Sequence, residues 1–307
     1  MRRDRGISRR EFFQAALAAG AGAVLSGRRA MAGAADRRVA LVRGTDCDRM
    51  VRRAVGMLGG PQRFVFPGAR VVVKPNASFA NAPEWGNNTN PAVVRAVCKL
   101  FREAGARRVT VLDYPLMRGA EALDLNGVAA ACKDLRGVDL RVLSAAHQFR
   151  PIAVPGKVLK TVSVAREVLD ADLLVNLPVA KAHDAVAASI GLKNLMGLIW
   201  DRAAFHTVLE INQAIADLAL AIRPSLTIVD MTRVLTTNGP QGPGEIATPE
   251  MLVASVDPVA ADSVAVGQVR FNGRRFRPKQ LRYLVHAHQA GLGEVRLGEI
   301  DIRKEDA

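Results

Sequence analysis

The chain has 307 residues, of which 43 are Lys or Arg and 29 are Asp or Glu, so its formal net charge is +14 at pH 7. Two Trp and two Tyr provide no aromatic platform of the kind on which single-stranded nucleic acid stacks, and no nucleic-acid partner is expected. The three cysteines, Cys47, Cys98 and Cys132, form no C-x-x-C pair, which excludes ligand sets for a zinc knuckle or an iron–sulfur cluster.

The excess of basic residues has two interpretations. It favours an acidic ligand or an anionic surface as a partner. The arginines are scattered, however, with no run longer than a pair such as Arg52-Arg53, and this pattern favours a solvated basic surface. Residues 1–32 contribute +5 of the charge, so the remainder of the chain is still basic.

Residues 1–32 have the order of a secretory signal. The paired arginines of S-R-R-E-F-F (8–13) precede an apolar run over 15–25, and A-M-A (30–32) resembles a cleavage site. Paired arginines indicate the twin-arginine branch, so we expect the twin-arginine export machinery to carry the chain to the periplasm. The alternatives are an uncleaved segment, an amphipathic helix or a membrane anchor, although a spanning helix needs ~20 apolar residues and this run is shorter.

Beyond the signal, the chain alternates β-rich runs with segments of helical spacing. Strands are expected at 39–43, 70–76, 108–114, 139–143, 172–179, 226–231, 252–256 and 294–302. Helices are expected at 48–58, 91–104, 127–135, 166–171, 186–199, 208–222, 259–268 and 278–290. A hairpin is expected over 152–154 and 158–164, and a turn-rich loop over 238–244.

This alternation predicts the fold class. Strands that are apolar on both faces and separated by helices are typical of a mainly parallel sheet with helices on both faces. The hairpin is expected to be a small insertion. Residues 33–307 are expected to form one α/β domain with no membrane span.

Polar side chains gather where the predicted strands end. Lys74 and Asn76 end one strand, Asp113 ends another, and Asp230 ends a third. Ligands of open α/β sheets bind beyond the carboxyl ends of strands, so these residues are expected to converge. A lysine and an asparagine two positions apart suit a phosphate or carboxylate. The alternative is that strand ends are polar because they meet solvent.

A second group of candidates follows the predicted strand 172–179. It comprises Lys181 and His183, and then Lys193 and Asn194 in G-L-K-N-L-M-G (191–197). His183 is a candidate base or metal ligand. The glycines of this segment either permit close packing or loosen a helix. Asp257 is expected to cap the helix that follows it.

These segments resemble a known family, catalogued as Domain of Unknown Function 362. The matching stretches are V-V-V-K-P-N (71–76), T-N-P-A-V-V (89–94), E-A-G-A-R-R-V-T-V-L-D (103–113), L-V-N-L-P-V-A-K-A-H (174–183), G-L-K-N-L-M-G (191–197) and D-P-V-A-A-D (257–262). The resemblance implies an α/β fold and family positions at Lys74, Asn76, Thr89, Asp113, Lys181, His183, Lys193, Asn194, Asp257 and Asp262. Many relatives also carry a four-cysteine ferredoxin segment, which this chain lacks.

The sequence therefore predicts an exported α/β protein that binds an anionic small molecule, as an enzyme with or without a metal. The expected ligand-binding residues are Lys74, Asn76, Thr89, Lys181, Lys193 and Asn194. The expected catalytic residues are His183 and Asp113, and the candidate metal ligands are Asp113, His183 and Asp230. The lysines are expected to be exposed. The alternative is a non-catalytic accessory protein that binds a cofactor or an exported redox partner.

Overall fold

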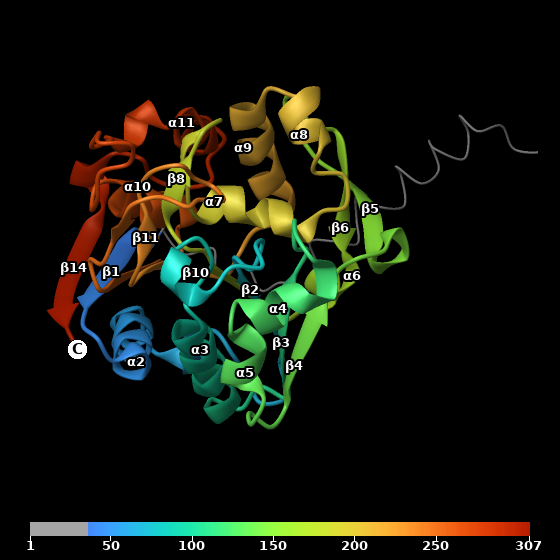
Figure 1. The fold of residues 1–307 in the computed structure, drawn as a ribbon, viewed down its shortest axis with the longest axis vertical. Helices are drawn as coiled ribbons and strands as arrows, with labels where there is room; N and C mark the ends of the chain where they lie inside the picture. The colour runs from blue at the N-terminus through green and yellow to red at the C-terminus, as the bar shows by residue number, and fades with distance from the viewer. Residues whose placement is uncertain (1–35) are drawn as a thin grey trace, which may run out of the picture.

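The computed structural model describes residues 36–307, so the predicted signal lies outside the described part. Within that part, eight strands form one sheet in the order β14-β1-β13-β10-β7-β2-β3-β4 (Figure 1). Their bounds are β1 (Arg38–Arg43), β2 (Arg70–Pro75), β3 (Arg108–Asp113), β4 (Val138–Val142), β7 (Leu173–Leu177), β10 (Leu226–Met231), β13 (Met251–Ser255) and β14 (Asp301–Asp306). Neighbouring strands are parallel, except that β13 runs antiparallel to β1 and β10.

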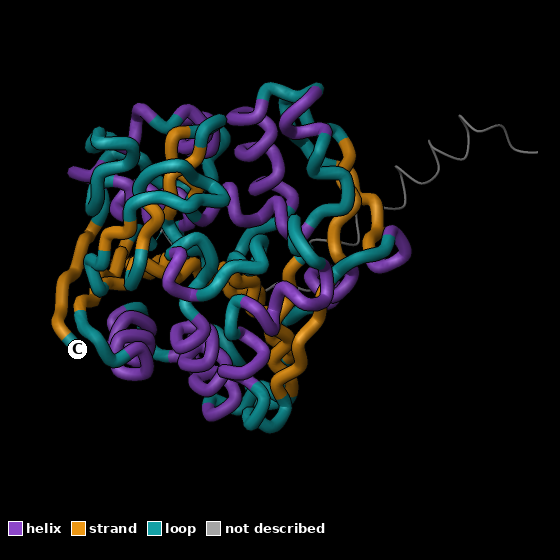
Figure 2. The backbone as a smooth tube through the Cα atoms, viewed as in Figure 1, coloured by secondary structure: helices purple, strands orange, loops and turns teal. Residues whose placement is uncertain are grey.

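Helices cover both faces of this sheet, as predicted. The strand β2 shows why, because Val71 and Val73 belong to one buried core and Val72 to the other. A strand with apolar side chains on both faces must be covered on both. One face is covered by α2 (Cys47–Met57), α3 (Pro91–Glu103), α4 (Ala122–Leu125) and α5 (Val128–Cys132). The other is covered by α6 (Arg166–Asp170), α7 (Gly191–Asn194), α8 (Ala204–Thr207), α9 (Ile211–Ala221), α10 (Pro258–Val266) and α11 (Arg282–Gln289) (Figure 2).

Three small antiparallel pairs lie outside the main sheet. The pair β5 (Phe149–Ala153) and β6 (Thr161–Ala165) is the predicted inserted hairpin. The other two were not predicted: β8 (Lys181–His183) with β9 (Ala187–Ser189), and β11 (Val234–Leu235) with β12 (Ile246–Ala247). Short 3-10 turns complete the elements, at η1 (Pro61–Arg63), η2 (Pro83–Trp85), η3 (Gly119–Glu121), η4 (Ala146–Gln148), η5 (Leu195–Leu198), η6 (Pro278–Gln280) and η7 (Leu297–Glu299).

Two predicted elements are wrong. The helix expected over 186–199 is instead β9 followed by α7 and η5. The strand expected over 294–302 begins only at Asp301. The buried carboxylate of Glu294 accepts hydrogen bonds from the backbone N–H groups of Val295 and Arg296, which holds the chain in a turn there.

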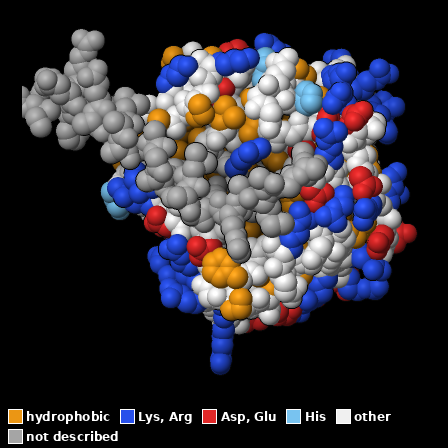
Figure 3. All heavy atoms as spheres, turned by 180° about the vertical axis from the view of Figure 1, so that it is seen from behind, with side chains coloured by type: hydrophobic (Ala, Val, Ile, Leu, Met, Phe, Trp, Pro, Cys, Tyr) orange, Lys and Arg blue, Asp and Glu red, His pale blue; other side chains and the backbone are white. Residues whose placement is uncertain are grey.

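Charged side chains are distributed widely over the molecule. Figure 3 shows Lys and Arg spread over one face and mixed with Asp and Glu. None of the helices described in residues 36–307 is long and apolar enough to cross a membrane.

Candidate functional site

The parallel strands β2, β3, β7 and β10 end at one edge of the sheet, and this brings the predicted site residues close together. Lys74 and Asp113 occupy the ends of the adjacent strands β2 and β3. Nζ of Lys74 donates to Asp113 Oδ1 at 2.7 Å and to Asn194 Oδ1 at 3.2 Å. The convergence that the strand-end pattern predicts is therefore present for these three residues.

The Lys74–Asp113 ion pair is closed to solvent, with the two side chains 1% and 0% exposed. Asp113 also accepts hydrogen bonds from the backbone N–H groups of Ala77 and Tyr114. Burial lowers the pKa of Lys74, and the Asp113 carboxylate opposes that shift. Because both Asp113 oxygens have donors, the geometry favours a positioning role for this residue.

An amide network joins the pair to the neighbouring strands. Asn194 Oδ1 accepts from Asn76 Nδ2 at 3.0 Å, and Asn194 Nδ2 donates to Asn176 Oδ1 at 2.9 Å. The Thr89 hydroxyl accepts from the Asn76 backbone N–H and donates to the Leu177 carbonyl. Asn176 was missed from the sequence, although a polar residue inside the apolar run L-L-V-N-L was the available signal.

Lys181 is buried rather than exposed, at 2% exposure, so the expectation of surface lysines is wrong for it and for Lys74. Its Nζ donates to Asn76 Oδ1 at 2.8 Å and to the Asn87 carbonyl, and lies 4.7 Å from the centre of the Phe79 ring. Within residues 36–307 no carboxylate pairs with it. Burial, followed by the charges of Lys74 and Lys193, lowers the pKa of Lys181 well below its usual range.

Lys193 is also largely buried, at 9% exposure, and no residue in the described part of the chain forms a hydrogen bond or ion pair with its ammonium group. Burial, followed by the charge of Arg202, lowers the pKa of Lys193 to about 8. Burying a cation without a hydrogen-bond partner is costly, and this cost sets Lys193 apart from Lys74.

The short helix α7 positions Lys193 and Asn194. Its first backbone N–H groups, from Gly191 and Leu192, donate to the two oxygens of Asp262 at 2.8 and 2.9 Å. Burial raises the pKa of Asp262 to about 7. The contact links the D-P-V-A-A-D segment to G-L-K-N, since the carboxylate holds the start of the helix that carries the lysine.

The two glycines of this segment permit close packing. A Cβ atom on Gly191 would lie 2.6 Å from Asp262 Oδ1. A Cβ atom on Gly197 would lie 2.3 Å from Asp113 Oδ1 and 2.6 Å from Lys74 Nζ. Both positions therefore exclude a side chain because a buried polar group occupies the space.

His183 lies in β8, two residues after Lys181, and its ring stacks on His206 with centroids 6.2 Å apart. Asp184 Oδ1 lies 2.9 Å from Nδ1 of His183. The backbone N–H of Ala185 is 3.1 Å from the same nitrogen, but it also donates to Asp184 Oδ1 at 2.8 Å. Nδ1 accepts from Ala185 in one tautomer and donates to Asp184 in the other, and in the second tautomer the Nε2 lone pair is free.

The imidazole of His183 is neutral at physiological pH. Burial, followed by the charge of Lys193, lowers the pKa of His183 to about 3. So low a pKa makes the ring a weak proton acceptor, and an anion bound beside Lys193 would raise the pKa of His183 toward its usual range.

Arg202 completes the group of cations. Its guanidinium donates to the backbone carbonyls of Tyr114 and Pro115 and lies 4.1 Å from the centre of the Tyr114 ring. No carboxylate in residues 36–307 forms an ion pair with it, and burial lowers its pKa. Arg202 and His206 were missed from the sequence because the segment D-R-A-A-F-H (201–206) contains no recognisable motif.

Among the described residues, Asp230 forms no hydrogen bond with the site lysines or with His183. Its oxygens accept from the backbone N–H of Asn90, at the start of α3, and from the backbone and hydroxyl of Thr232. In the described part of the chain, no three His, Cys, Asp or Glu residues are placed to hold a metal, so the candidate set Asp113, His183 and Asp230 is not assembled. The predicted helix cap at Asp257 is confirmed, because its carboxylate accepts from the Ala260 N–H at 2.8 Å.

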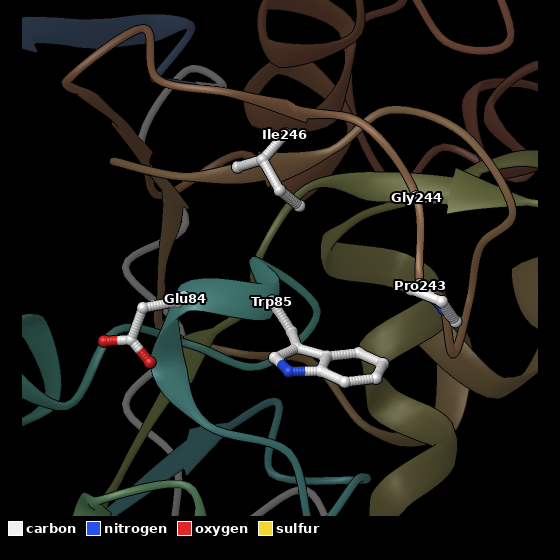
Figure 4. Close-up of a pocket in the computed structure, with 5 residues that line it drawn as sticks. All are labelled: Glu84, Trp85, Pro243, Gly244 and Ile246. Atoms are coloured by element: carbon white, nitrogen blue, oxygen red, sulfur yellow. The ribbon is translucent and has the colours of Figure 1, made fainter.

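Two loops, over residues 77–90 and 238–244, meet beside β8. In the first, Asn81 and Asn87 donate to the Gln241 carbonyl of the second. A cavity of about 280 Å³ lies between them, with the Trp85 indole below the segment that carries Pro243 and Gly244 (Figure 4). Its lining is mainly apolar, so this cavity differs in chemistry from the surroundings of Lys181 and Lys193.

Comparison with known proteins identifies a relative and a family. A thylakoid-associated protein of Synechocystis sp. is 31% identical over 226 residues, which cover 70% of this chain and 67% of that protein. The family model described as Domain of unknown function (DUF362) matches residues 71–267, a range that contains all ten of the family-pattern residues predicted above.

Two solved structures resemble the fold weakly. The lactate racemase apoprotein from Thermoanaerobacterium thermosaccharolyticum has a TM-score of 0.47 and 14% identity, and a protein from Thermotoga maritima has a TM-score of 0.47 and 12% identity. The matches cover 75% and 72% of this chain, and the chain spans 57% and 58% of those two proteins. On the extent of the family match, the chain belongs to the family described as Domain of unknown function (DUF362).

Proposed function

We propose that the protein binds a small carboxylate- or phosphate-bearing molecule and acts on it as an enzyme, with His183 accepting a proton. The binding site is the cationic cluster, which we define as Lys181, Lys193 and Arg202. One observation carries the proposal: Lys181 and Lys193 are buried, Arg202 is partly buried, and none of the three forms an ion pair with a carboxylate within the described residues.

The electrostatics of the cluster support this proposal. Arg202 lowers the pKa of Lys193, and Lys193 lowers the pKa values of Lys181 and His183, so these groups lie within range of one another. Two carboxylates oppose these charges: Asp113, which is paired with Lys74, and Asp184, whose side chain is 79% exposed. Buried cations that repel one another are stabilised when an anion enters, and this difference in energy is available for binding.

His183 supplies the chemical function. In the tautomer whose Nδ1–H donates to Asp184, its neutral ring has a free Nε2 lone pair, and a bound anion would raise its pKa. The adjacent cations would stabilise negative charge that develops on a bound molecule as a proton leaves. Asp113, by contrast, is assigned to holding Lys74 in place, because both of its carboxylate oxygens accept hydrogen bonds from groups within the fold.

Calorimetric titration with oxalate and inorganic phosphate tests the binding step. The affinity is expected to be full below pH 8 and to fall as the pH rises through about 8, because Lys193 loses its charge there. Lys193→Ala should weaken binding by about tenfold to a hundredfold, which corresponds to one charge-assisted hydrogen bond of roughly 1.5–3 kcal/mol.

The matched control is Lys133→Ala. This lysine is exposed and follows α5 on the opposite face of the sheet, so the same loss of charge should leave the affinity unchanged. Equal losses in the two variants would show that net charge alone attracts the anion, and the proposed site would be wrong.

A further inference from the structure

The three lysines of the site are not equivalent. Lys74 is paired with Asp113, and Lys181 donates to two oxygens and packs on an aromatic ring. Lys193 alone has neither a hydrogen bond nor an ion pair with the described residues, although its side chain is only 9% exposed. We propose that Lys193 is a nucleophile that forms an imine with a 2-oxo carboxylate held at the cationic cluster.

This inference rests on the proposed anion site and adds a substrate class to it. In the step, the neutral ε-amine of Lys193 attacks the ketone carbon and forms a C–N bond. The two amine protons and the carbonyl oxygen leave as water, and the product is a C=N double bond. No oxidant, reductant or metal is needed, so the atoms and electrons balance within the two reactants.

Two properties of the site favour the uncharged amine. Lys193 is buried beside the Arg202 guanidinium, and both burial and a neighbouring cation oppose a charge on the lysine. A pKa of about 8 leaves roughly a tenth of the amine uncharged at pH 7, far more than for a lysine with the usual pKa. The fold also fixes the backbone that carries the amine, because Asp262 binds the first two N–H groups of α7.

The ligand class follows from the surrounding charges. An imine needs a carbonyl carbon at Nζ, and the cations beside it need an anionic group close to that carbon. A 2-oxo carboxylate carries both on adjacent atoms. The guanidinium of Arg202 uses one N–H from each of two nitrogens on backbone carbonyls, so further N–H groups remain for a carboxylate.

His183 gives the imine a consequence that can be measured. Forming an imine acidifies the C–H bonds next to the former carbonyl, and His183, whose pKa the charge of Lys193 lowers, is the base within range of it. With pyruvate in D₂O, the protein should therefore exchange the methyl protons for deuterium. The exchange should be lost in Lys193→Ala and strongly reduced in His183→Gln.

The direct experiment uses the full chain, pyruvate and sodium borohydride. Borohydride delivers hydride to the imine carbon and converts it to a stable secondary amine, which peptide mass spectrometry locates. We expect one adduct, at Lys193, with pyruvate and none with acetone, which has the carbonyl but not the carboxylate. Lys193→Arg should lose the adduct while weakening oxalate binding less than Lys193→Ala does, because arginine keeps the charge but forms no imine.

The outcomes separate this inference from the proposed function. Oxalate binding that depends on Lys193, together with a pyruvate adduct at Lys193, supports both. Oxalate binding with no adduct at Lys193, or with equal labelling of Lys133, overturns the imine and leaves the anion site standing. Absence of oxalate binding overturns the proposed function. Equal labelling of Lys193 by acetone and by pyruvate overturns the imine inference. Circular dichroism of each variant confirms that it is folded.

Discussion

At the scale of single residues, the partners of each buried charge decide what it can do. The ammonium of Lys74 is neutralised by Asp113 and held by Asn194, so it is part of the structure. The ammonium of Lys193 has no such partner among the described residues, and for this reason the proposed function assigns it to the ligand. Family-pattern lysines that look alike in the sequence therefore have different roles, and mutations should distinguish them.

Asp113→Asn should destabilise the protein strongly. The substitution preserves the size of the side chain but leaves the buried Lys74 without its counter-charge. Breaking a buried ion pair from one side costs about 3–5 kcal/mol. Urea denaturation should show a fall of that order in the free energy of unfolding.

The control for this prediction is another pair that involves β3. Arg108 on β3 and Asp139 on β4 form an ion pair whose side chains are 56% and 38% exposed. Asp139→Asn should change the free energy of unfolding by only ~0–1 kcal/mol, because water replaces the lost partner. A comparable loss in both variants would mean that the Lys74–Asp113 pair has no special structural role.

At the scale of elements, the sheet was predictable and the segment that carries the site lysine was not. Strands β2, β3, β7 and β10 lie where the apolar runs placed them, since burial on both faces leaves a continuous signal. The segment 186–199 has helical spacing but contains the three-residue strand β9, then α7 and η5. Its conformation is set by contacts with distant residues, Asp262 and Asp113, which local periodicity does not record.

The same limit applies to the site. The strand-end residues Lys74 and Asp113 were predicted to meet because parallel strands end at one edge, and they do. Burial of Lys74 and Lys181 was not predicted, because a lysine in a sequence gives no sign of the groups that will cover it. Arg202 and His206 enter the site through a loop and a four-residue helix, whose positions follow only from the tertiary fold.

Gly197→Ala tests whether this segment is fixed by close packing. The added methyl group would meet Asp113 Oδ1 at 2.3 Å and Lys74 Nζ at 2.6 Å, so the buried pair must shift. Such overpacking costs about 1–3 kcal/mol, and thermal unfolding should show a lower melting temperature.

The matched control is Gly56→Ala in α2, where a Cβ atom would meet nothing within 4 Å. That variant should be equally stable or more stable, because alanine favours a helix over glycine by roughly 0.5–1 kcal/mol. Equal melting temperatures for the two variants would contradict the packing role of Gly197.

At the scale of the whole molecule, the sheet joins the two ends of the described chain. The strand β1 pairs with β14, so the sheet is complete only when residues 301–306 are in place (Figure 1). The site likewise draws on residues from Lys74 to Asp262. The site therefore forms only when these distant segments are folded together.

The paired arginines at 9 and 10 lead to a prediction for the whole protein. Twin-arginine signals are recognised through two adjacent guanidinium groups, and lysine lacks their planar, five-donor geometry. Changing Arg9→Lys together with Arg10→Lys should therefore abolish transport to the periplasm, as judged by cell fractionation and immunoblotting. The matched control changes Arg2→Lys together with Arg3→Lys, which keeps the same charge outside S-R-R-E-F-F and should be transported normally.

Because the route accepts folded proteins, Asp113→Asn should also accumulate in the cytoplasm to the extent that it fails to fold. Normal periplasmic yield of the Arg9, Arg10 variant would show that the signal is not of the twin-arginine type, and transport of an unfolded Asp113→Asn chain would show that folding is not required before export.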